Sequence, residues 1–131
     1  MSKYAKKVYG IEIIEEAVEM ANENAKLNDV TNVEFIAGDV EEKLDILINK
    51  QKIKPDIILV DPPRKGLDNK SIENILRIKP KKMIYISCNP ATLVRDLAIL
   101  EINYNIKKIT PVDLFCFTSH VECCSVLSLK D

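Results

Sequence analysis

Hydrophobic positions along the chain alternate between two spacings. Short continuous apolar runs, which are typical of buried strands, occupy residues 8–13, 33–36, 57–60 and 83–86. Between these runs, apolar residues recur every three or four positions, as in an amphipathic helix. This second pattern covers residues 14–25, 40–48 and 72–76. Strands that alternate with helices pair in parallel, so the pattern predicts an α/β sandwich with a mostly parallel sheet.

The last third of the chain follows a different pattern. Asn89 and Pro90 come directly after an apolar run, and these residue types favour a helix cap and a first helical position. Residues 104–112 and 121–129 then read as two strands with no helix between them. They predict an antiparallel hairpin at the end of the sheet. We expect one domain over residues 1–131.

The composition is that of a folded, nearly neutral protein. The 131 residues are 47% hydrophobic, and 19 Lys and Arg oppose 20 Asp and Glu. Disordered chains combine low hydrophobicity with high net charge, so we expect a single compact core. A net charge of −1 excludes the strongly basic field of proteins that hold nucleic acid by charge alone. Any contact with RNA must be local or shared with another module.

Targeting and cysteine patterns indicate a cytoplasmic protein without a membrane partner. No apolar run approaches the roughly 20 residues of a membrane helix, and no signal-type apolar stretch follows the basic N-terminus. The cysteines lack the Cys-x-x-Cys spacing of zinc sites, so we expect free thiols and no metal. They are Cys88, Cys116, Cys123 and Cys124.

Acidic residues stand at or just beyond the ends of the first two predicted strands. Ligands of parallel α/β sheets bind beyond the carboxyl ends of strands. Glu12 could accept hydrogen bonds from ribose hydroxyls, or it could be a solvated carboxylate. Asp39 could accept from an adenine amino group, or it could simply cap the helix that follows.

The third strand runs into the sequence Asp-Pro-Pro-Arg, in which two prolines restrict the backbone between Asp61 and Arg64. Methyltransferases that act on exocyclic amines often have an aromatic residue after a similar Pro-Pro pair. Arg64 occupies that place here, which argues against amine methylation and suits a phosphate or carbonyl contact. The alternative is a stiff turn that carries a surface arginine.

Cys88 is the strongest single candidate for chemistry. It follows a predicted buried strand and precedes a predicted helix, whose free N–H groups and dipole favour the thiolate. We therefore interpret it as a nucleophile. The alternative, a small buried hydrophobic residue, is the better interpretation of Cys116, Cys123 and Cys124.

A last polar cluster contains His120 and Glu122, which share one face of an extended segment. Glu122 begins a strand that we expect near the middle of the sheet, where it could act as a general base beside Cys88. A Cys88–His120 pair of the thiol-hydrolase type is a competing interpretation. An exposed polar hairpin is the third.

Three motifs together resemble one family. Residues 61–66 (DPPRKG), 87–93 (SCNPATL) and 120–122 (HVE) are similar, in order and spacing, to motifs of the RNA (uracil-5-)-methyltransferases, which form 5-methyluridine in tRNA or ribosomal RNA. Residues 8–12 and 38–39 look like the cofactor segments of the family. The resemblance covers nearly the whole chain. It implies a Rossmann-like sandwich that uses S-adenosylmethionine as its cofactor.

The resemblance also implies a mechanism and a role for each polar residue. Cys88 adds to C6 of the uracil ring, C5 takes the methyl group from S-adenosylmethionine, and Glu122 removes the C5 proton. The other roles are cofactor binding by Glu12, Asp39 and Asp61, and substrate binding by Arg64, Asn89 and His120. We expect a uridine of ribosomal RNA slightly ahead of one of tRNA.

One departure from the family is large. Its cofactor domain begins with a strand and a glycine-rich loop, whereas this sequence starts inside the following helix and has only three glycines. We therefore expect a C-terminal catalytic part that lacks the first strand, binds the cofactor weakly and self-associates. The alternatives are an inactive fragment, an RNA-binding module and a cytosine-C5 methyltransferase. The last would place a cysteine in the loop where this chain has Pro63 and Arg64.

Overall fold

A computed structural model describes residues 1–114 and 116–131. The chain forms two compact units, Met1–Ile53 and Lys54–Asp131, and each is described by itself. The organisation as one domain stays a prediction. Among the described residues, no helix is long and apolar enough to cross a membrane.

The first unit is built on two parallel strands, β1 (Val8–Glu12) and β2 (Val33–Ala37), with Glu12 opposite Ala37. The helix α1 connects them and buries Val18. The strands therefore end side by side, as the sequence predicts for a strand–helix–strand unit. The helices of this unit are η1 (Ser2–Tyr4), α1 (Glu15–Leu27), α2 (Val40–Asp45) and the π-helical turn η2 (Ile46–Lys50).

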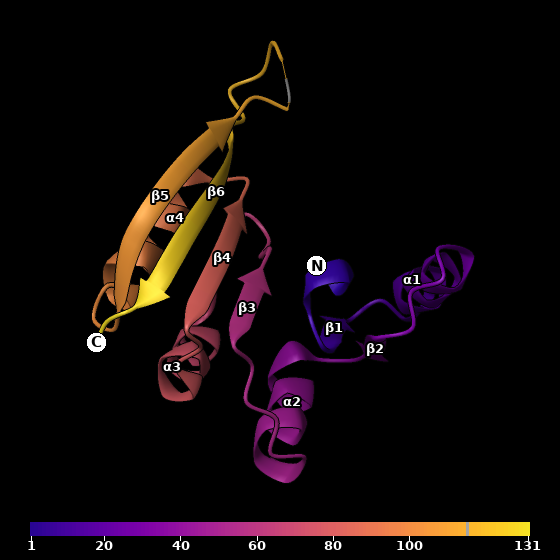
Figure 1. Ribbon diagram of the computed structural model, residues 1–131. Helices are drawn as coiled ribbons and strands as arrows, with labels where there is room; N and C mark the ends of the chain where they lie inside the picture. The colour runs from indigo at the N-terminus through magenta and orange to yellow at the C-terminus, as the bar shows by residue number, and fades with distance from the viewer. Residues whose placement is uncertain (115) are drawn as a thin grey trace. The chain divides into compact units, whose positions relative to one another are not determined.

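The second unit is a four-stranded sheet with two helices (Figure 1). The strand order is β3-β4-β6-β5; β3 and β4 are parallel, and β6 is antiparallel to both of its neighbours. This confirms the α/β class and the C-terminal antiparallel hairpin. The elements are β3 (Ile57–Val60), α3 (Asn69–Ile78), β4 (Lys82–Ser87), α4 (Pro90–Leu100), β5 (Tyr104–Val112) and β6 (Glu122–Leu129).

The core of this unit lies between the sheet and the helices α3 and α4. Tyr104 is fully buried, its hydroxyl donates to the carbonyl of Pro80 at 3.1 Å, and burial raises the pKa of Tyr104 to about 12. The core side chains come from both helices and from three strands. They are Ile72, Ile75, Met83, Tyr85, Leu93, Leu97, Leu100, Tyr104, Cys123 and Leu127.

β3 combines an apolar sequence with a position at the edge of its sheet. Four apolar residues in a row are typical of a central strand, but in the described part of the chain β3 stands at one edge of its sheet. Ile57 and Leu59, which alternate with the less exposed Ile58 and Val60, are 46% and 41% exposed. Within the described part of the second unit, β3 therefore has one unpaired edge with exposed apolar side chains.

Candidate active site

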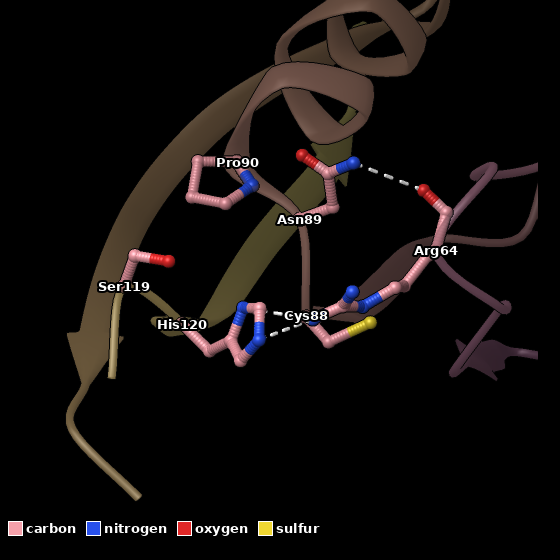
Figure 2. Close-up of a pocket in the computed structure, with 6 residues that line it drawn as sticks. All are labelled: Arg64, Cys88, Asn89, Pro90, Ser119 and His120. Atoms are coloured by element: carbon pink, nitrogen blue, oxygen red, sulfur yellow. Dashed lines mark hydrogen bonds between the residues drawn. The ribbon is translucent and has the colours of Figure 1, made fainter. Parts of the chain in front are cut away.

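Three segments of the second unit surround a pocket of about 210 Å³. They are the loop after β3, the junction of β4 and α4, and the loop that leads into β6. This volume is below the roughly 300–1,000 Å³ of sites for larger ligands, so it suits a group the size of one base. The lining residues are Arg64, Cys88, Asn89, Pro90, Ser119 and His120 (Figure 2).

Cys88 is held at the point where β4 ends and α4 begins. The Asn89 side chain caps the helix by accepting a hydrogen bond from the backbone N–H of Ala91 at 3.1 Å, and Pro90 is the first helical residue. The Ser87 hydroxyl donates to the Asn89 carbonyl at 3.0 Å. Both predicted roles, Asn89 as cap and Pro90 as first residue, are confirmed. The half-buried Cys88 therefore sits at the N-terminal end of an eleven-residue helix.

The pairing of β4 with β6 brings Cys88 and Glu122 to the same end of the two strands. In the antiparallel register Ser87 lies opposite Cys123. Cys88 is the residue directly after β4, and Glu122 is the residue before Cys123 in β6, so each directly adjoins this last pair. β6 is an interior strand, as the sequence predicts for the strand that Glu122 begins.

Arg64 reaches from the loop after β3 to the ring of His120. One terminal guanidinium nitrogen lies 2.7 Å from both ring nitrogens of His120 (Figure 2). Arginine only donates, and a neutral imidazole has a single acceptor nitrogen, so Arg64 donates to one ring nitrogen at a time. The described contact of the His120 ring in this pocket is therefore with Arg64.

Asp61 and Glu122 are near the ends of strands but are not among the residues that line the pocket. Asp61 directly follows β3 and is exposed, whereas Glu122 is half-buried as the first residue of β6. The structure thus brings Arg64, Cys88, Asn89 and His120 to one pocket.

The two remaining acidic candidates lie in the first unit, at adjacent strand ends. Glu12 accepts from the backbone N–H of Ile14 at 2.9 Å, and the Glu12 carbonyl accepts from Gly38 N–H at 2.9 Å. Asp39 caps α2 by accepting from Glu42 N–H at 3.1 Å, so its predicted role as a cap is confirmed. Both carboxylates are exposed acceptors, and their chemistry fits the hydroxyl and amino donors of an adenosine group.

The cysteines differ in their surroundings. All four are free thiols, as expected. Cys123 is buried as predicted and Cys124 is half-buried. The prediction of a buried Cys116 is wrong because this residue lies in the loop between β5 and β6, where its side chain is exposed. In the described residues, no group of three His, Cys, Asp or Glu side chains could hold a metal ion.

Sequence reasoning missed three residues at or behind the pocket. Ser119 lines the pocket itself. Asp96 and Arg95 of α4 contact the loop that carries Arg64. Asp96 had a signal in the sequence, because it falls three residues after Leu93 and beside Leu97, within the apolar stripe of the helix.

The fold is that of methyltransferases. A solved tRNA (uracil-54, C5)-methyltransferase from Pyrococcus abyssi, in complex with S-adenosyl-L-homocysteine, superposes with a TM-score of 0.79 at 34% identity over 96% of this chain and 30% of that one. An rRNA methylase from Streptococcus thermophilus has a TM-score of 0.70 at 14% identity over 99% of this chain and 77% of that one, which is a likeness of fold alone.

Sequence comparison narrows the class to a family. The family model described as tRNA (Uracil-5-)-methyltransferase matches residues 1–130, and the chain belongs to this family. An uncharacterized RNA methyltransferase of Listeria innocua is 49% identical over 99% of this chain, and one of Oceanobacillus iheyensis is 48% identical over 99%. The chain spans only 29% and 28% of these two relatives. The predicted family resemblance is confirmed.

Proposed function

We propose that this chain carries the catalytic centre of an enzyme that transfers a methyl group from S-adenosylmethionine to C5 of a uridine in RNA. The observation that supports this most is the β4–β6 register, which pairs Ser87 with Cys123 and so brings the adjoining residues Cys88 and Glu122 to the same end of the two strands, with Cys88 in the pocket lining. A nucleophile and a carboxylate in this relation suit a reaction that begins with addition to a ring and ends with proton removal.

The proposed reaction proceeds through covalent adducts between Cys88 and the uracil ring, one before and one after methyl transfer. The Cys88 thiolate adds to C6 of uracil, and the electrons of the C5–C6 double bond move to C5 and the C4 carbonyl. C5 then bonds to the methyl carbon, and the sulfonium sulfur leaves with the electron pair of the broken bond. Glu122 takes the C5 proton, the double bond re-forms, and Cys88 is expelled as thiolate. S-Adenosylmethionine supplies only the methyl group.

Arg64, Asn89 and His120 are proposed to bind the RNA around the reacting base. Arg64 is a permanent cation at the pocket, so it suits a phosphate or a base carbonyl. A uridine within a duplex is out of reach of such a pocket, which requires a flipped-out or single-stranded target. The nearly neutral chain supplies little general attraction for RNA, and we assign that attraction to other parts of the complete gene product.

Cofactor binding is proposed for Glu12, Asp39 and Asp61. Glu12 and Asp39 are exposed carboxylates at neighbouring strand ends, and such acceptors suit the ribose hydroxyls and the adenine amino group. Asp61 follows β3 and would act between the cofactor and the base. We expect weak binding by the chain alone, which calorimetric titration with S-adenosylhomocysteine tests; tight stoichiometric binding would contradict it.

The RNA substrate and the cellular location are proposed as well. On the basis of the Cys88 motif we propose a ribosomal uridine as the substrate, whereas the similar Pyrococcus abyssi enzyme is named for a tRNA uridine. The cytoplasm is the proposed place of action.

We also infer that the chain alone self-associates through β3, because this strand is apolar on both faces and has a free edge in the described part of the chain.

The test is methyl transfer by the complete gene product to unmodified ribosomal RNA and, separately, to unmodified tRNA. Digested nucleosides are analysed by mass spectrometry. We expect 5-methyluridine from one of the two RNAs, none with Cys88→Ala, and full activity with the matched control Cys116→Ala, which removes an exposed thiol outside the pocket. Methyl groups on an exocyclic amine, or 5-methyluridine from Cys88→Ala, would overturn the proposal.

A further inference from the structure

Polar side chains of α4 hold the loop that carries Arg64. The Asn89 amide donates to the Arg64 carbonyl at 3.1 Å, and the Thr92 hydroxyl lies 3.2 Å from the same oxygen and 3.1 Å from the Asn89 carbonyl, so it donates to one of them at a time. Asn89 is also the cap that sets the start of the helix next to Cys88. The two walls of the pocket, one with Arg64 and one with Cys88, are therefore joined through α4.

Arg95 continues this contact one turn further along the helix. Its guanidinium donates to the carbonyls of Lys65 at 2.9 Å and Leu67 at 3.2 Å. The same side chain donates through Nε to Asp96 Oδ1 at 2.8 Å. One rigid planar group thus links two loop carbonyls to a carboxylate, a geometry that lysine cannot reproduce.

Asp96 is fully buried and completes the contact. Its Oδ2 accepts from the backbone N–H of Leu67 at 2.8 Å and from the Tyr85 hydroxyl at 2.6 Å. Burial, together with this hydrogen bond, raises the pKa of Tyr85 well above its usual value. A buried carboxylate is tolerated only where its partners are in place. The network therefore favours a single position of the loop.

Gly66 shows how closely the loop packs on this network. Its φ is +78°, and a Cβ added there would lie 2.6 Å from Asp96 Oδ2 and 2.7 Å from a guanidinium nitrogen of Arg95. Both the backbone angle and the space therefore require glycine. The loop cannot shift toward α4, and its hydrogen bonds keep it from moving away.

We propose that Arg95 and Asp96 are positioning residues that hold Arg64 at the Cys88 pocket. Neither residue lines the pocket, and both act through the backbone of residues 65–67. Arg64 in turn presents its charge beside Cys88. The inference rests on the proposed function only for the measurement of KM for RNA. The position of the Arg64 charge is measured by alkylation of Cys88, which needs no methyl transfer.

The first test measures that charge with two alkylating reagents in the isolated chain. Iodoacetate is an anion and iodoacetamide is neutral, so the ratio of their reaction rates at Cys88 reports a nearby positive charge. Trypsin releases Cys88 in the peptide 83–95, apart from the other cysteines. We expect Arg64→Ala and Arg95→Lys each to lower the ratio about threefold, as for one unit charge roughly 6 Å away in a water-like medium.

A double variant separates positioning from an independent effect. If Arg95 acts through Arg64, Arg64→Ala with Arg95→Lys lowers the ratio no further than Arg64→Ala alone. Arg77→Lys is the matched control, because Arg77 is on α3 and binds Asn74 of its own helix; it should leave the ratio unchanged. A wild-type ratio in Arg95→Lys, or a double variant that multiplies the two effects, would overturn the proposal.

Two further readouts keep the result interpretable. Alkylation of the buried Cys123 reports loss of the fold. If Arg95→Lys unfolds the chain, Gly66→Ala takes its place, because it displaces the same loop. A lowered iodoacetate-to-iodoacetamide ratio in Gly66→Ala then supports the proposal, and a wild-type ratio overturns it. In the complete gene product, Arg95→Lys should raise KM for RNA about tenfold, as for one lost charge-assisted contact, and leave kcat unchanged. A wild-type enzyme without 5-methyluridine would refute the proposed function, while the alkylation ratio would still decide the positioning.

Discussion

The proposed role of Glu122, removal of the C5 proton, can be tested by a single substitution. Glu122 begins β6 beside the last β4–β6 pair, Ser87 and Cys123, and lies outside the pocket lining. Glu122→Gln keeps the shape and removes the base. We expect turnover to fall by roughly 10²–10⁴-fold, with RNA bound covalently to the protein. Denaturing electrophoresis with unmodified RNA detects this species.

Glu101→Gln serves as the control for this experiment. Glu101 is exposed at the end of α4, and its backbone carbonyl rather than its side chain accepts from Lys130. We expect normal turnover and no accumulated adduct. Undiminished 5-methyluridine formation by Glu122→Gln would contradict the assignment of Glu122 as the base.

Ser125 is expected to respond in the opposite direction to most buried residues. It is fully buried in β6, and its hydroxyl has no hydrogen-bond partner within the described residues. An unsatisfied buried hydroxyl costs about 1–3 kcal/mol. We expect Ser125→Ala to raise the free energy of unfolding by about 1 kcal/mol in urea titration, while Ser128→Ala, at a half-buried position of the same strand, changes it little. A loss of stability in Ser125→Ala would contradict this.

At the scale of residues, local chemistry was predictable and long-range partners were not. Asn89, Pro90 and Asp39 act within a few positions of themselves, so their caps could be predicted from sequence order. The contact of Arg64 with His120 joins residues far apart in the chain and depends on the folded sheet. Asp96 finds its loop partner in the same way, through the return of α4 along the sheet.

At the scale of elements, α3 depends on its cap. Asp68 accepts from the backbone N–H of Ser71 at 2.8 Å and from its hydroxyl at 3.0 Å, and the backbone hydrogen bond chiefly lowers the pKa of Asp68. We expect Asp68→Ala to cost about 1 kcal/mol at neutral pH. The free energy of unfolding from chemical denaturation measures this loss.

The same cap gives a pH dependence with a defined sign. A carboxyl whose pKa is lowered on folding stabilises the folded state above its unfolded value of about 3.9, and this contribution disappears as the pH falls through the folded value. We therefore expect the difference between wild type and Asp68→Ala to be constant near neutrality and to shrink below about pH 4. A difference that persists in acid would contradict an ionised cap.

Elements were predictable where the hydrophobic period was clear. The strand predicted at 104–112 matches β5, and that predicted at 121–129 matches β6 but for its first residue. The helix predicted at 40–48 is instead α2 followed by the π-helical turn η2. Periodicity alone does not register this change of winding, because leucine and isoleucine continue at helical spacing through it.

At the scale of the whole molecule, the free edge of β3 governs the behaviour expected of the isolated chain. Ile57 and Leu59 expose apolar surface along a strand with an unpaired side in the described residues. We expect self-association in sedimentation velocity that increases with protein concentration. Leu59→Lys, which places a charge on the edge strand, should reduce it.

A matched substitution distinguishes association through this edge from nonspecific association. Val94→Lys adds the same charge at an exposed position of α4, where Val94 is 66% exposed, and should leave the association unchanged. The inference would be contradicted if the wild-type chain were strictly monomeric at every protein concentration at which it is soluble.

Composition predicted a folded core and little general affinity for RNA, but it did not predict how the strands divide between sheets. The sequence of β3 indicates a central strand because four apolar residues suit burial on both faces. Which strands flank it depends on pairing partners that no local pattern specifies, and the described residues place β1 and β3 in separate sheets. Four of the predicted site residues, Arg64, Cys88, Asn89 and His120, line one pocket because they lie in the segments just after β3, just after β4 and just before β6.

The most direct test of covalent catalysis uses RNA that contains 5-fluorouridine. Fluorine stands where the C5 proton would be removed, so methylation can proceed but Cys88 cannot be expelled. With the complete gene product and S-adenosylmethionine, we expect a stable RNA–protein adduct whose tryptic peptide, 83–95, carries the modification on Cys88. Cys88→Ala should form none. An adduct on another residue, or one that still forms in Cys88→Ala, would contradict the proposed nucleophile.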